Sequence, residues 1–281
     1  MKRKIMAMCL VIAMAATAII GGTLAYFTDT DSAKNVMVTG NVKIYQNEQQ
    51  RTIGDELDND AQHQSIRKEK DGLEDFEDNK KLYPITKEFK YDKNVTIIDG
   101  QRARPMADND YNVVDKIVTV TNEGTEKAYA RTLFAFEMLA IKGDDGQVTY
   151  DYAMNGMNGP LVINTVLDIY GSGMTPVVND NGEWVTFDLT KDNGETVRYA
   201  VCEYYHGELA SGETSVPSLL QMYLKSDVNN DFYDHVGNEY EILTLSQATQ
   251  TAGFTDCKQA LDQAFGKVAD ADLVEWFKDV K

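Results

Sequence analysis

Short segments in which apolar and polar residues alternate recur along the chain from residue 111 onward. A period of two is typical of strands with one buried face. Turn residues separate the segments, among them Gly124 and the Asn193-Gly194 pair, and the latter predicts a hairpin. The strands predicted in this way, including two nearer the N-terminus, are 36–45, 95–98, 115–121, 128–138, 183–189, 196–205, 219–224 and 240–245. Together they indicate a mostly β protein, an antiparallel β-sandwich.

Two connections are ambiguous. The turn at 122–126 predicts either a β-hairpin or a short Greek-key connection between its flanking strands. The apolar run at 161–169 fits either a strand or a helix. Helical spacing appears only at 256–265, with Thr255 as its cap and Gly266 as its stop, and at 272–280. We expect these short C-terminal helices to plug the open end of the sandwich.

Residues 46–110 differ in character, since they are polar and poor in β-branched runs. The first strand is expected to end at residues 46–48. An apolar island, Leu82-Tyr83-Pro84-Ile85, should dock on the main domain. We interpret 46–110 as a partly ordered acidic insertion, because it has too few apolar residues for a core of its own. The predicted divisions are 1–25, 26–45, 46–110 and 111–281, with 36–45 completing the sandwich.

The N-terminus carries the pattern of a secretory signal peptide. Basic residues at 2–4 precede an apolar run at 5–20, and small residues at Thr23 and Ala25 predict cleavage before Tyr26. The run is short for a membrane span, although extension to Ala25 makes an uncleaved, membrane-tethered N-terminus the alternative. We expect a secreted protein that touches the membrane only through this segment before cleavage.

Charge narrows the classes of partner. Loss of the leader, which holds three basic residues and no acidic one, takes the net charge from −18 to −21. Such a charge argues against nucleic acid and anionic lipid as partners. It suits an exported protein, or one that meets cations.

Two cysteines remain after cleavage, Cys202 and Cys257. An oxidising exterior would permit a disulfide between them, whereas two cysteines alone define no framework. The sequence leaves two alternatives open: a bridge, or two separate thiols.

Few residues suggest metal chemistry. The histidines His63, His206 and His235 are scattered, and no H-E-x-x-H motif is present. We name no catalytic residue. Asp227, Asn229 and Asp231 match the opening of a calcium loop, but Phe232 and Asn238 occupy the positions where an EF-hand has Gly and Glu. Calcium is therefore the one candidate cofactor, and a solvated acidic loop is the alternative.

The junction after the apolar run, GGTLAYFTDTD, resembles the signal-peptide class handled by the dedicated peptidase SipW. That class heads the TasA/camelysin family of proteins exported by Gram-positive bacteria. Four further segments resemble this family. They are Gly40-Asn41-Val42-Lys43-Ile44; Leu82-Tyr83-Pro84; a strand–turn–strand with Val118, Val120, Asn122, Gly124, Tyr129 and Arg131; and Leu209-Ala210 with Gly212-Glu213-Thr214, Pro217, Gln247, Gln250, Gly253 and Phe254.

The resemblance implies a jelly-roll-like sandwich located in the extracellular matrix (biofilm) or on the cell surface, and a SipW-type signal peptidase as partner. Some members polymerise by donating the mature N-terminal segment to the sheet of the next subunit. In this chain the donated segment would be Tyr26, Phe27, Thr28 and Asp29. The alternative is an unpaired terminus. Other relatives carry a metallopeptidase label, so an exported metallopeptidase is the competing function.

Overall fold

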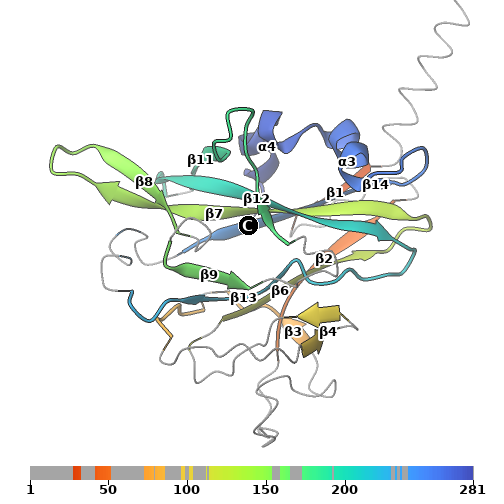
Figure 1. Cartoon of the computed structure of the whole chain (residues 1–281), viewed down its shortest axis with the longest axis horizontal. Helices are drawn as coiled ribbons and strands as arrows, with labels where there is room; N and C mark the ends of the chain where they lie inside the picture. Colours follow the sequence, from red (N-terminus) through yellow and green to blue (C-terminus); the bar gives the residue numbers. More distant parts are fainter. Residues whose placement is uncertain are drawn as a thin grey trace, which may run out of the picture.

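Two stacked antiparallel sheets form a β-sandwich (Figure 1). The structure, a computed structural model, describes residues 28–32, 42–51, 73–78, 80–85, 96–98, 101–103, 112, 114–153, 159–164, 173–191, 193–228, 232, 235 and 240–280. The larger sheet has the order β1-β14-β7-β12-β10, with β8 on β7 and β11 on β12. The smaller sheet has the order β3-β2-β6-β13-β9, and β4 and β5 form a separate hairpin. The predicted β-sandwich is confirmed.

The strands of the larger sheet are β1 (Thr28–Ser32), β7 (Ala128–Lys142), β8 (Val148–Tyr152), β10 (Thr175–Pro176), β11 (Thr186–Thr190), β12 (Thr196–Leu209) and β14 (Ile242–Gln250). The smaller sheet contains β2 (Ile44–Arg51), β3 (Leu73–Asp75), β6 (Val114–Asn122), β9 (Leu161–Asn164) and β13 (Leu219–Leu224). The separate hairpin consists of β4 (Thr96–Ile98) and β5 (Gln101–Ala103). The run at 161–169 is thus a strand as far as residue 164.

Apolar side chains gather on both faces of the larger sheet. Between the sheets, Phe134 and Phe136 of β7 pack with Val118 and Leu219. On the outer face, Tyr199 and Leu245 pack with residues of the C-terminal helices. These helices are α3 (Cys257–Phe265), the 3₁₀ turn η3 (Val268–Asp270) and α4 (Leu273–Phe277). They cover the outside of the sheet (Figure 1), so the prediction that they plug an end of the sandwich is wrong.

The strand β2 extends further than its polar sequence predicts. It continues to Arg51, whereas the sequence placed its end at residues 46–48. Gln46 and Gln50 are buried although they are polar, because both make hydrogen bonds: Gln46 Nε2 with Glu48 and Gln50 Nε2 with Glu74. Residues 46–51 therefore belong to the sandwich rather than to the insertion.

The turn at 122–126 connects the two sheets. The strand β6 before it lies in the smaller sheet and β7 after it in the larger one, so the hairpin alternative is wrong. Asn122 organises this crossing. Its Nδ2 donates to the carbonyls of Glu126 at 2.8 Å and Leu209 at 3.0 Å, and its Oδ1 accepts from the Gly124 amide at 2.9 Å.

The other local predictions are mostly confirmed. The β11–β12 hairpin turns through Asn193-Gly194, where Gly194 has φ 85°. Ile85 docks on the domain through a 3.0 Å bond from its amide to the Leu224 carbonyl. Gly266 ends α3 with φ 90°, but the cap is Asp256 rather than Thr255.

Candidate functional site

The first described strand lies at the edge of the larger sheet. β1 pairs antiparallel with β14, in a register that runs from Thr28 opposite Thr249 to Ser32 opposite Leu245. On its other side β14 pairs with nine residues of β7. Two of the residues predicted to form a donor strand, Thr28 and Asp29, thus lie in a strand that adds to a sheet edge within its own chain. We call the backbone of residues 245–249 the acceptor edge.

The outer face of the acceptor edge is held by Arg131 of β7. The Arg131 side chain is fully buried, and its Nε donates to Gln247 Oε1 at 2.9 Å. Its two other nitrogens bind α3 and the residue that ends it, at 3.1 Å to Asp262 Oδ1 and 3.3 Å to the Gly266 carbonyl. The guanidinium carbon also lies 5.8 Å from the centre of the Trp276 ring. Arg131 therefore joins the acceptor edge to the C-terminal helices.

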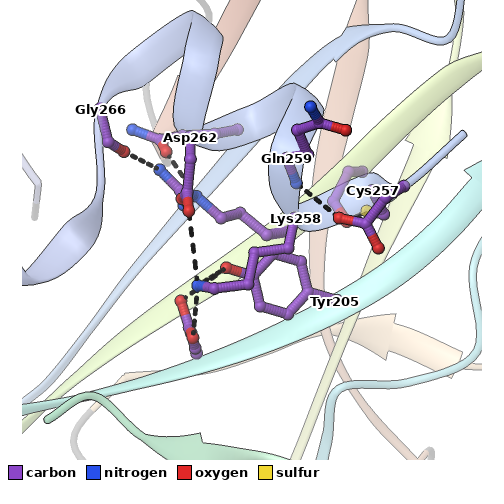
Figure 2. A network of polar contacts seen from close by, with 11 residues as sticks. Tyr205, Cys257, Lys258, Gln259, Asp262 and Gly266 are labelled. Atoms are coloured by element: carbon purple, nitrogen blue, oxygen red, sulfur yellow. Dashed lines mark hydrogen bonds and ion pairs between the residues drawn. The ribbon is translucent and has the colours of Figure 1, made fainter. Parts of the chain in front are cut away.

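The same network continues along the surface of α3 (Figure 2). Lys258 Nζ donates to the Tyr205 hydroxyl of β12 at 2.9 Å, and it lies 3.6 Å from Asp262. Asp256 accepts from the Gln259 amide at 2.7 Å and so caps the helix. These contacts attach the helix to β12 as well as to β7.

The inner face of the acceptor edge is held by a polar chain that crosses the sandwich. Ser246 Oγ of β14 donates to Gln46 Oε1 of β2, in the opposite sheet, at 2.6 Å. Ser246 Oγ is also 2.9 Å from Thr132 Oγ1, which is 2.8 Å from His206 Nε2. Burial lowers the pKa of His206 to about 3, so its ring stays neutral at physiological pH.

These two sets of contacts do not involve β1. Pairing with β7, the Arg131–Gln247 bond and the Ser246–Gln46 bond all fix β14 from its other sides. The acceptor edge is therefore also fixed by contacts from residues outside β1. Chemically it presents backbone N–H and C=O groups in a fixed register, which an extended peptide can pair with.

The two cysteines are separate thiols, so the disulfide alternative is wrong. Cys202 faces the core between the sheets, whereas Cys257 begins α3 outside the larger sheet, with its Sγ 3.7 Å from the Ala130 carbonyl. The sheet lies between the two sulfur atoms. Burial raises the pKa of each thiol to about 12, so both are poor nucleophiles near neutral pH.

The remaining predicted residues are only partly placed. Thr23, Ala25, Tyr26 and Phe27 lie outside the described residues, and so do Asn229 and Asp231 of the calcium candidate. Asp227 lies in an exposed turn, in a pocket of about 260 Å³ that Lys225 and His235 also line. Within the described ranges no group of three His, Cys, Asp or Glu side chains is placed to hold a metal ion. No helix in the described part of the chain is long and apolar enough to span a membrane.

The sequence interpretation gave Arg131 a role in strand packing, with contact to a partner as the alternative, and gave no role to Glu137. Arg131 and Glu137 are the only charged residues between 128 and 138, a segment that is otherwise almost entirely apolar. Both are buried on the helix-covered side of the sheet or at its margin. A charge inside an apolar strand indicates a specific buried partner, since an unpaired buried charge is too unfavourable to persist.

Comparisons of this chain with protein-family models, with curated proteins and with solved structures find no match.

Proposed function

We propose that this chain is an exported structural protein of the cell surface or extracellular matrix, and that it associates with further copies by exchange of its N-terminal strand. The observation that carries the proposal is the pairing of β1 with the acceptor edge. The signal-peptide pattern at 1–25 and the high negative charge support export to the aqueous space outside the cell.

When two copies exchange β1, each β14 keeps the same backbone pairing. A β1 donated by a second copy forms the same five residue pairs with β14 that the chain's own β1 forms. Since the bonds are equivalent, the balance depends mainly on protein concentration and on the chain segment that follows β1. A head-to-tail exchange that does not close on itself yields open chains of subunits.

A disulfide trap tests this exchange. Thr28 and Thr249 are directly opposite in the register, and directly opposite residues bring their Cβ atoms to about 4.5–5.5 Å, near the separation a disulfide needs. We would mix one preparation carrying Thr28→Cys with another carrying Thr249→Cys and oxidise both gently. Strand exchange predicts a disulfide-linked dimer of the two variants.

The matched control uses Thr190→Cys in place of Thr249→Cys. Thr190 is exposed in β11, which lies toward the opposite edge of the larger sheet from β1. Dimers with this partner would report collision rather than exchange. If the Thr28/Thr249 mixture stays monomeric at every concentration, while the double variant within one chain crosslinks internally, β1 is an intramolecular strand only and the assembly proposal is wrong.

Two simple measurements complete the test. Negative-stain images of protein with and without residues 26–33 would show whether assemblies need the N-terminal segment. N-terminal sequencing of the exported protein decides between a free Tyr26 and a retained leader, while zinc content and a casein assay test the metallopeptidase alternative.

A further inference from the structure

Two glutamates meet where β14 begins. The Glu241 amide donates to Glu137 Oε2 at 3.0 Å, and the Glu137 amide donates to the Glu241 carbonyl at 3.3 Å. Two tyrosine hydroxyls also donate hydrogen bonds to these glutamates. The Tyr199 hydroxyl of β12 donates to the Glu241 carboxylate, and the Tyr240 hydroxyl donates to the Glu137 carbonyl at 3.0 Å. The group therefore connects β7 and β12 to Tyr240 and Glu241, the two residues just before β14.

One ammonium serves both carboxylates. Lys191 Nζ lies 3.9 Å from Glu137 and 3.6 Å from Glu241. The Glu137 side chain is 8% exposed and that of Glu241 41% exposed. Glu195, in the turn between β11 and β12, adds further negative charge. With both carboxylates ionised, one ammonium faces two anions, one of which is nearly excluded from water.

The protonation of Glu137 follows from this setting. Burial raises its pKa to about 7, and Glu241 and Glu195 act in the same direction, against the opposing effects of Lys191 and the Glu241 amide. Burial also raises the pKa of Tyr199 and of Tyr240, so both hydroxyls remain protonated donors. Glu137 is thus the group in this cluster that changes charge near neutral pH.

We propose that Glu137 and Glu241 form a proton-controlled latch on the start of β14, closed when Glu137 carries a proton and loosened when both carboxylates are ionised. The sign follows from linkage. Local opening exposes Glu137 and returns its pKa toward 4.5, so the open state releases a proton that the closed state holds. Opening therefore becomes easier as the pH rises from about 4.5 to 7, and it levels off above that range.

Amide hydrogen exchange measures the latch directly. For the amides of residues 241–245, we expect the opening equilibrium, corrected for intrinsic exchange, to rise about 10- to 30-fold between pH 5.5 and pH 8. In Glu137→Gln the rise should disappear, because the neutral amide does not titrate. In the control Glu126→Gln, which alters an exposed turn residue, it should persist.

Each outcome decides the proposal. A flat profile in the unmodified protein overturns it, and so does a profile that survives Glu137→Gln. If that variant does not fold, the carboxyl carbon of Glu137 is titrated by NMR in the unmodified protein. A midpoint near 4.5 would then overturn the latch, whereas a midpoint near 7 that falls in Glu241→Gln would support it.

Discussion

Arg131 of β7 and Asp262 of α3 form an ion pair of 3.1 Å in which the arginine side chain has no exposed surface. The same guanidinium binds Gln247 and the Gly266 carbonyl, so three separate parts of the chain meet on one side chain. A charge at this depth is tolerated only because its donors are occupied. The C-terminal helices are consequently attached to the sheet by a polar contact as well as by apolar packing.

Replacement of that arginine should be strongly destabilising. We expect Arg131→Met to lower the free energy of unfolding by about 3 kcal/mol, since it removes the donor to Gln247 and leaves Asp262 with only the more distant Lys258. The matched variant is Arg198→Met. It breaks an ion pair with Asp188 that is partly exposed on both sides, and should cost less than about 1 kcal/mol. Urea unfolding of both variants measures the difference, and equal losses would contradict a specific role for Arg131.

The cap of α3 offers a second comparison. Asp256 accepts from the Gln259 amide, so Asp256→Ala should destabilise the protein by about 1 kcal/mol. Thr255→Ala, one residue earlier, should be nearly neutral. Thermal unfolding of the two variants side by side tests which residue begins the helix, and a larger loss from the threonine variant would restore the assignment made from sequence.

His206 should make the protein sensitive to acid. Its pKa is about 3 in the folded chain and about 6.5 in the unfolded chain, so between these values the unfolded state binds the extra proton. The unfolding free energy should therefore fall by about 1.4 kcal/mol for each pH unit below 6.5, until the pH approaches 3. His206→Gln removes this contribution. The quantity to measure is the difference between the two proteins from pH 7 to pH 4, and a difference that does not change with pH would show that the ring protonates freely.

The thiols should behave as two unlinked, protected groups. Alkylation of denatured, unreduced protein is expected to add two labels to the chain that begins at Tyr26, or three if Cys9 is retained. The folded protein should react slowly, because burial raises the pKa of both thiols. Mass spectrometry counts the labels. A denatured protein that accepts none until it is reduced would reveal a bridge.

Much of the sandwich could be predicted from sequence. Strands β6, β11, β12 and β13 all lie where the sequence predicts strands. Alternation between buried and exposed positions is clear in β11, whereas β13 is buried at all six positions. The second half of β2 could not be predicted, since Gln46 and Gln50 occupy buried positions with polar side chains. The hydropathy pattern predicts that such polar residues are exposed. Partners distant in sequence explain them: Ser246 of the opposite sheet bonds Gln46, and Glu74 of β3 bonds Gln50.

The candidate site was also only partly predictable from sequence. A donated N-terminal strand was expected from family resemblance, but the partner strand was not, because β14 lies more than two hundred residues away. The turn at 122–126 likewise looks the same in either topology. The Asn122 amide distinguishes them by its bond to Leu209, a residue distant in sequence. Cysteine spacing contains no information on which face of a sheet each sulfur occupies.

The pairing of Thr28 with Thr249 has a consequence for biogenesis. A chain that crosses a membrane from its N-terminus delivers β1 first and β14 almost last. Under the export that we propose, β1 has no partner of its own until the end of translocation, and closing so large a loop is slow relative to local folding. During that interval a neighbouring, already finished molecule is the nearest competitor for the strand, so the rate of delivery should influence how many subunits mature alone.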